Sequence, residues 1–276
     1  MTADRVSQWV ELVDACYAPE HAASWDAVGL HVGDRDDPVS SVLVSLDVTL
    51  GVLDEALDRG ADLVIAHHPL LFRPLARLTP DTAAGAVALR AARSRVAVVA
   101  VHTNFDVAVQ GTTEPVVRTL GLTDVRPLEP RDDDPRLGLG RVGTLASPTP
   151  VRQLADRLVD ELPAPHLRVA GALDRRVRRV AACGGAGDSL VDAARRAGAE
   201  LYVTGDLRHH VVLDALTLGM AVIDAGHHAT ESAALPALID RLAAAAGSRG
   251  LSAGLLASTT TTQPWSDYCA HRGSKV

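Results

Sequence analysis

The stretch Leu63-Val64-Ile65-Ala66-His67-His68-Pro69 joins a short apolar run to two histidines and a proline. Neighbouring residues of a β-strand point to opposite faces, so two adjacent histidines can serve one site only where the strand ends or turns. Pro69 supplies that end, because proline has no backbone N–H to donate to a neighbouring strand. In α/β proteins, ligands bind beyond the carboxyl ends of the strands. The stretch therefore predicts a buried strand over residues 62–66 that delivers His67 and His68 to a functional site.

Two further apolar runs end in the same types of residue. They are 96–101, followed by His102 and Asp106, and 220–223, followed by His227 and Glu231. Because residues four positions apart share one face of a helix, His227 and Glu231 can face one point if a helix begins near Ala229. Because histidines and carboxylates follow all three predicted strands, we expect these residues to meet in a single site.

Five of these side chains are candidate metal ligands, and they comprise three imidazoles and two carboxylates: His67, His68, Asp106, His227 and Glu231. Five ligands exceed what one tetrahedral ion needs. Carboxylates can bridge, so the set predicts two divalent ions about 3.5–4 Å apart, with Asp106 and Glu231 bridging. Imidazole and carboxylate ligands without thiolate suit zinc, iron, manganese or nickel. His102 is a candidate hydrogen-bond donor to a ligand or a proton shuttle.

Composition and charge favour an α/β fold and disfavour a general nucleic-acid surface. Of 276 residues, 47% are hydrophobic and only 3% aromatic, which suits helices packed on a parallel sheet. The net charge of −7 argues against a general nucleic-acid surface. Cys16, Cys183 and Cys269 show neither a zinc-knuckle nor a disulfide spacing. A reducing, cytoplasmic location is therefore expected. No apolar run approaches the roughly 20 residues of a membrane span, and the N-terminus lacks a signal-peptide pattern.

The chain divides into two halves with related patterns. Residues 59–65 and 197–203 each read as a helix end, a glycine and a following strand. A duplicated βαβ module explains this similarity, and chance matching in an alanine-rich chain is the alternative. We expect a first α/β half over 1–130 and a second over 131–240, with 240–276 packing back on the first. Residues 127–135, rich in Pro and Asp, are expected to link the halves. Residues 183–188 are expected to form a glycine turn that either cradles a phosphate or simply joins a strand to a helix.

The sequence resembles the Nif-three-like dinuclear-metal family, whose members are also known as GTP cyclohydrolase 1 type 2 homologues. The segments that carry the resemblance extend over nearly the whole chain: 24–30 (SWDAVGL), 66–70 (AHHPL), 102–106 (HTNFD), 204–206 (TGD) with His210, and 225–227 (AGH) with Glu231. The resemblance implies two similar α/β halves with a dinuclear site in the cleft between them, and the same five ligands. It also implies a toroidal homohexamer. Where an aromatic residue is usual, this chain has His228, which is a candidate extra ligand, proton carrier or neutral replacement.

We expect a metal-dependent hydrolase in which His102 or His228 moves the proton. Two ions would activate a water and hold the electrophilic oxygen of a small-molecule or nucleotide substrate. The cyclohydrolase reaction is implied by the resemblance alone, because no triphosphate or base pocket can be identified in the sequence. The alternatives are a non-enzymatic metal-binding or protein-interaction ring, and a DNA-binding ring, which the acidic balance disfavours.

Overall fold

The computed structural model describes residues 3–162 and 167–266, and it contains a five-stranded sheet with the order β13-β4-β5-β6-β2. Its strands are β2 (Gly29–Val32), β4 (Ser41–Ser45), β5 (Leu63–Ala66), β6 (Ala97–Ala100) and β13 (Gly254–Ala257). The pairs β13–β4, β4–β5 and β5–β6 are parallel, and β2 pairs antiparallel with β6. The strands β1 (Asp4–Arg5) and β3 (Pro38–Val39) form a separate, two-stranded antiparallel sheet. The predicted strand over 62–66 is confirmed as β5.

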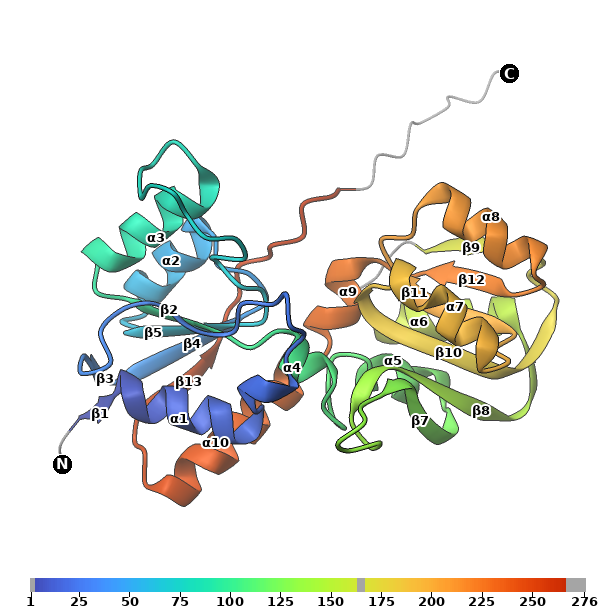
Figure 1. Cartoon of the computed structure of the whole chain (residues 1–276), viewed down its shortest axis with the longest axis horizontal. Coiled ribbons are helices and arrows are strands. Elements are labelled where there is room, and N and C mark those ends of the chain that lie inside the picture. The colour runs from blue at the N-terminus through green and yellow to red at the C-terminus, as the bar shows by residue number, and fades with distance from the viewer. Residues whose placement is uncertain (1–2, 163–166, 267–276) are drawn as a thin grey trace, which may run out of the picture.

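Helices cover both faces of this sheet (Figure 1). On one face lie α2 (Leu50–Asp58) and α3 (Ala83–Arg93), and on the other lie α1 (Val6–Cys16) and α10 (Leu235–Arg249). The core of α1 and α10 contains the buried Trp9 and Leu238, packed with strand residues such as Ile65. The opposite core is formed by residues such as Val52 and Val64. Both faces of β5 are therefore buried, which explains its uninterrupted apolar sequence.

The second sheet has six strands in the order β7-β8-β10-β11-β12-β9. They are β7 (Thr123–Pro130), β8 (Gly138–Pro150), β9 (Arg168–Ala170), β10 (Arg176–Ala186), β11 (Leu201–Gly205) and β12 (Ala221–Asp224). Only β10, β11 and β12 are paired in parallel. Helices α5 (Glu114–Leu120) and α6 (Val151–Glu161) share one core with this sheet. The short helix η2 (Asp188–Leu190), α7 (Val191–Arg196) and α8 (His209–Thr217) lie along the other core.

Two segments differ from the sequence-based expectation. The Pro- and Asp-rich stretch 127–135 is not a simple linker, because its first residues belong to β7, which pairs with β8. Prolines are tolerated there because β7 is an edge strand. The second sheet therefore begins at residue 123, with β7, and not after residue 130. Likewise, residues 183–186 continue strand β10 instead of forming a turn, with an irregular register between Ala182 and Ala186.

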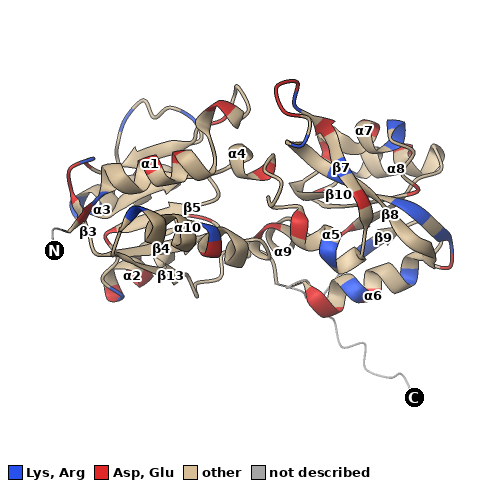
Figure 2. Cartoon of the chain, turned by 90° about the horizontal axis from the view of Figure 1, so that it is seen from below, with Lys and Arg blue, Asp and Glu red and all other residues tan. Residues whose placement is uncertain are grey.

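Two short helices lie between the sheets, namely α4 (Thr103–Asp106) after β6 and α9 (His227–Ser232) after β12 (Figure 1). Acidic and basic residues are scattered over both parts of the chain (Figure 2). Within the described ranges, no helix combines the length and apolar content that crossing a bilayer requires.

Candidate metal centre

The ends of β5, β6 and β12 deliver the five predicted ligands to one place. His67 and His68 follow β5 directly, Asp106 ends α4, and His227 and Glu231 lie on α9. The helix α9 begins at His227, two residues earlier than the expected start near Ala229. Both residues therefore lie within the same helix, four positions apart and on one face.

The ligand atoms form two groups of three that share Glu231. One group contains His68, His227 and Glu231, and the other contains His67, Asp106 and Glu231, with all atoms of a group within 4.8 Å of one another. Oε2 of Glu231 lies 3.0 Å from Nε2 of both His68 and His227. Oε1 of Glu231 lies 3.6 Å from Nε2 of His67, and Asp106 Oδ1 lies 3.7 Å from the same nitrogen. The two oxygens of one carboxylate thus face different groups, which is the geometry of a bridging ligand.

Each histidine of the two groups is oriented by a hydrogen bond at its Nδ1 atom. His67 Nδ1 lies 3.0 Å from the carbonyl oxygen of Val101. His68 Nδ1 lies 2.8 Å from Asp47 Oδ1, and His227 Nδ1 lies 2.8 Å from Asp206 Oδ2. A proton held at Nδ1 by an oxygen leaves Nε2 free as a ligand, and such outer partners are a regular feature of metal sites. All three Nε2 atoms are directed into the cluster.

Two observations show that the cluster fits divalent metal. Nε2 of His67 is buried and, within the described residues, makes no hydrogen bond, which is costly unless a cation takes that place. Nε2 of His68 and Nε2 of His227 lie only 3.3 Å apart. Two nitrogen ligands at about 2.0–2.1 Å from a tetrahedral ion lie roughly 3.3–3.4 Å apart. The spacing of these nitrogens therefore matches that of two ligands on one ion.

His102 also faces this cluster, and its ring is held by a different carboxylate, that of Asp26. One of its nitrogens groups with those of His67 and His68 within 4.8 Å. Its Nδ1 atom lies 2.8 Å from Oδ1 of Asp26, whose side chain is fully buried. Burial raises the pKa of Asp26, but hydrogen bonds from His102 and Thr103 outweigh burial and hold that pKa well below its usual range. An ionised Asp26 can only accept, so in the neutral ring of His102 the proton lies at Nδ1 and Nε2 is the unprotonated nitrogen.

The sequence reasoning did not predict that Asp26, Asp47 and Asp206 hold the histidines, although Asp26 and Asp206 lie in segments that carry the family resemblance. Asp26 and His102 are separated by 76 positions, and the other two pairs by 21 each. Asp47 and Asp206 each follow a strand, β4 and β11, so they share the strand-end signal of the predicted ligands. That signal could have identified these two, whereas Asp26 lies in a segment without such a pattern.

His228 lies outside the three ligand groups found in the described part of the chain. It is next to His227 on α9 and lines a neighbouring hollow of about 290 Å³ with residues 258–262 and Leu46. Burial is the main cause that lowers its pKa from 6.5. The lowered pKa favours the neutral imidazole. The role of His228 as a proton carrier stays a prediction.

Gly185 provides the space that the shared carboxylate occupies. It has φ +68°, and a Cβ atom added to it would lie 2.0 Å from Oε1 of Glu231 and 3.5 Å from Nε2 of His227. Its backbone N–H donates to Oγ1 of Thr230 at 2.9 Å, which ties β10 to α9. The glycine-rich end of β10 therefore makes room for a carboxylate of the candidate metal centre. Residues 183–186 form neither the phosphate-binding turn nor the plain strand-to-helix turn that the sequence suggested.

The charges in the cluster shift the pKa values of its carboxylate and its histidines in opposite directions. Burial raises the pKa of Glu231, but the charge of His67 and the hydrogen bonds from His227 and His68 hold that pKa well below its usual range. Burial lowers the pKa of His68, but Asp47 and Glu231 outweigh burial and raise it to about 10. In His227, Glu231 and Asp206 outweigh burial in the same way, and the pKa is raised to about 9. Protons therefore compete with metal for these nitrogens at neutral pH.

We predict that chelator-treated protein loses stability as the pH rises from about 6.5 to about 10, through the raised pKa values of His227 and His68. A histidine whose pKa is raised in the folded state contributes its full stabilisation below the unfolded value, and loses it as the pH rises through the folded value. Differential scanning calorimetry should show Tm falling across this window, and metal uptake at pH 7 should release protons. The double variant His68→Ala, His227→Ala is the control and should lose most of this slope. An equal slope in the variant would assign the effect to other groups.

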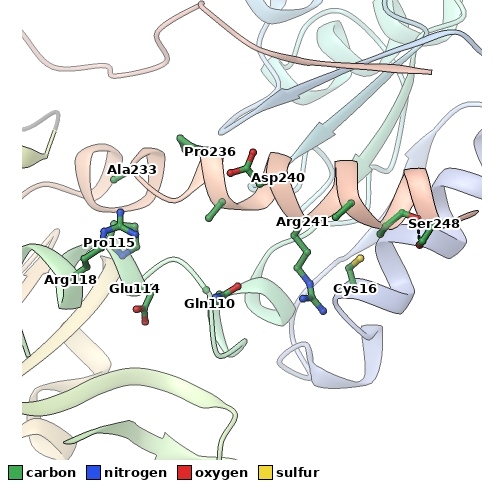
Figure 3. A pocket seen from close by; sticks show the side chains of 14 residues that line it. Cys16, Gln110, Glu114, Pro115, Arg118, Ala233, Pro236, Asp240, Arg241 and Ser248 are labelled. Atoms are coloured by element: carbon green, nitrogen blue, oxygen red, sulfur yellow. Dashed lines mark hydrogen bonds between the residues drawn. The ribbon is translucent and has the colours of Figure 1, made fainter. Parts of the chain in front are cut away.

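A larger cavity of about 830 Å³ lies elsewhere, between α10, α5 and α1 (Figure 3). Its lining includes Glu114 and Arg118 from α5 and Asp240 and Arg241 from α10. None of the predicted metal ligands lines this cavity. Its charges are mixed in sign, so the cavity has no electrostatic preference for cations, and the candidate metal centre remains at the strand ends.

Known proteins resemble the chain over nearly its full length. The profile of the family described as Duf34/NIF3 (NGG1p interacting factor 3) matches residues 4–264. A Streptomyces coelicolor protein named GTP cyclohydrolase 1 type 2 homolog is 40% identical over 278 residues, covering 96% of this chain and 95% of that protein. A Clostridium acetobutylicum protein of the same name is 31% identical over 242 residues, covering 87% of this chain and 90% of that protein.

Solved structures show the same fold. The Bacillus cereus protein related to NIF3 superposes with a TM-score of 0.91 at 25% identity, covering 97% of this chain and all of that one. Staphylococcus aureus protein SA1388 gives a TM-score of 0.89 at 25% identity, covering 96% and 99%. Because the profile, the relatives and the fold agree over nearly the whole chain, this protein belongs to the Duf34/NIF3 family.

Proposed function

We propose that this protein is a hydrolase that depends on two divalent metal ions, zinc, iron or manganese. The observation that supports it best is the shared position of Glu231, whose two carboxylate oxygens face different groups of ligands. Bound there, the ions would lower the pKa of a water and polarise an electrophilic oxygen of the substrate. The proposal places the site in the cleft between two similar α/β halves.

The residues of the chain have separate tasks in this proposal. His67, His68, Asp106, His227 and Glu231 hold the ions. The hydroxyl of Thr112 donates to Oδ1 of Asp106 at 2.6 Å and so fixes that carboxylate. His102 accepts a proton at Nε2 and returns it to the leaving group, while Asp26 keeps the ring oriented at Nδ1. The substrate is a small molecule, and the name carried by the relatives suggests a nucleotide.

The homohexameric ring belongs to the same proposal and is supported by the family resemblance. The division into halves 1–130 and 131–240 is retained in outline, with β7 assigned to the second sheet. The pairing of β13 with β4 supports the return of the segment 240–276 to the first half.

The experiment loads chelator-treated protein with zinc, manganese or iron(II) and assays panels of nucleotides, including GTP, and of phosphoesters. We expect turnover in the wild type and none in Asp106→Ala. We expect His102→Gln to lower kcat by about 10²–10⁴-fold, the usual contribution of a general base, with its metal content unchanged. Two bound ions without turnover above the Asp106→Ala background would contradict the hydrolase and favour a metal-binding or interaction role.

A further inference from the structure

Two exposed aromatic residues lie beside the candidate metal centre in a chain that has few aromatic residues. The chain has eight in total, three Trp, three Tyr and two Phe. Four of them are buried in the cores: Trp9, Tyr17, Phe105 and Tyr202. Trp25 is 61% exposed and Phe72 is 44% exposed. Single exposed aromatic residues need no explanation, but these two contact each other.

The two rings continue a chain of ring contacts that ends at the metal ligands. Trp25 and Phe72 meet edge to face with their centroids 5.9 Å apart. The ring of His102 is 6.3 Å from Trp25 and 6.4 Å from Phe72. The ring of His102 is in turn 5.1 Å from His67 and 5.6 Å from His68. A flat group resting on Trp25 and Phe72 would therefore have His102 and the cluster as its next neighbours.

Hydrogen bonds of the Asp26 and His31 side chains hold the backbone next to both aromatic residues. Trp25 precedes Asp26, which holds His102 and also accepts from the backbone N–H of Thr103 at 3.0 Å. Phe72 follows Leu71, whose N–H donates to Nδ1 of His31 at 3.0 Å. Nδ1 of His31 is thus the unprotonated nitrogen, so its Nε2–H donates to the carbonyl of Ala27 at 3.2 Å. His31 therefore connects the two segments that carry the exposed rings.

We propose that Trp25 and Phe72 form an aromatic platform that holds a planar aryl or heteroaryl ring of the substrate beside the metal centre. This inference rests on the proposed function for the location of the reacting group, and it adds the class of substrate: a molecule in which a flat ring adjoins the group bound by metal. Aromatic side chains bind flat rings by offset or edge-to-face contact at centroid distances of about 4.5–7 Å. His31 is a positioning residue for the platform.

The test measures binding without turnover, by calorimetric titration of metal-loaded protein with phenylphosphonate and with methylphosphonate. Neither C–P bond is hydrolysed at such a site, so the result does not depend on catalysis. We expect phenylphosphonate to bind about tenfold tighter than methylphosphonate in the wild type, in line with the usual contribution of one stacked ring. The variant Trp25→Ala, Phe72→Ala should lose this preference and bind methylphosphonate as the wild type does.

Two further variants control for indirect effects. Trp265→Ala removes a tryptophan that is 81% exposed and has no ring contact with a histidine in the described ranges, so it should keep the full preference. His31→Leu should lower the preference without changing methylphosphonate affinity. A preference that survives in the double variant, equal affinities in the wild type, or no binding of either phosphonate would overturn the platform.

The outcomes separate this inference from the hydrolase itself. Ring-dependent binding without turnover of aryl phosphoesters would keep the platform and contradict the hydrolase. Turnover with no preference for aryl over alkyl esters would keep the hydrolase and contradict the platform. If the double variant changed the sedimentation mass while the preference stayed, the two rings would be a contact between copies of the chain, and the platform would be wrong.

Discussion

The substitution Glu231→Gln is expected to abolish the tight binding of both metal ions. Glutamine has nearly the same shape, so the change removes charge and one oxygen ligand with little loss of packing. Both ligand groups contain Glu231, and its side chain is only 5% exposed. The loss of metal affinity should exceed the 10–100-fold that removal of an outer hydrogen-bond partner typically causes. Elemental analysis after dialysis, and calorimetric titration with zinc, measure the effect.

Two matched variants separate the shared ligand from the unshared ones. Asp106, which the sequence also predicted to bridge, lies only in the group that contains His67. Asp106→Asn should therefore leave about one ion per chain. Asp206→Asn removes only the outer partner of His227, so it should weaken one ion and leave the other unchanged. The bridging role of Glu231 would be contradicted if Glu231→Gln kept one ion at wild-type affinity while Asp106→Asn lost both.

The candidate metal centre was accessible from the sequence because of a topological rule. Parallel strands present their carboxyl ends at one edge of a sheet, so polar residues after β5 and β6 must lie close together. The rule does not say how two sheets face each other, yet His227 and Glu231 come from the six-stranded sheet. Their chemistry, a histidine and a carboxylate at helical spacing, was the signal that linked α9 to the first sheet.

The missed features depend on tertiary geometry. Asp26 holds His102 across 76 positions, and no local pattern of residues 24–30 indicates that contact. The path of residues 183–186 was misjudged because glycines suggest a turn, whereas here they continue β10 past a carboxylate. The stretch 127–135 was misjudged because prolines suggest a linker, although an edge strand accepts them. In the first two cases the deciding partner is distant in the sequence, whereas β8, the partner of β7, is the next strand along the chain.

The substitution Gly185→Ala is expected to disrupt the candidate metal centre without touching a ligand. The added Cβ atom would lie 2.0 Å from Oε1 of Glu231 and 2.9 Å from its Cδ atom, so the carboxylate must move. Because Glu231 serves both ligand groups, both ions should bind at least tenfold more weakly, an order of magnitude comparable to loss of an outer partner. Metal content after dialysis and calorimetric titration with zinc measure this loss.

The backbone strain of this substitution must be separated from its overlap with the carboxylate. An L-residue at the positive φ of Gly185 costs about 1–2 kcal/mol of folding stability wherever it lies. Gly60 has almost the same conformation, φ +65° against +68°, but open space around its Cβ position. Gly60→Ala should therefore lower the free energy of unfolding, measured by urea titration, by about 1–2 kcal/mol and leave metal binding intact. If Gly185→Ala also kept wild-type metal affinity, Glu231 would have room to shift, and the close fit of β10 against the shared carboxylate would not be what positions the ions.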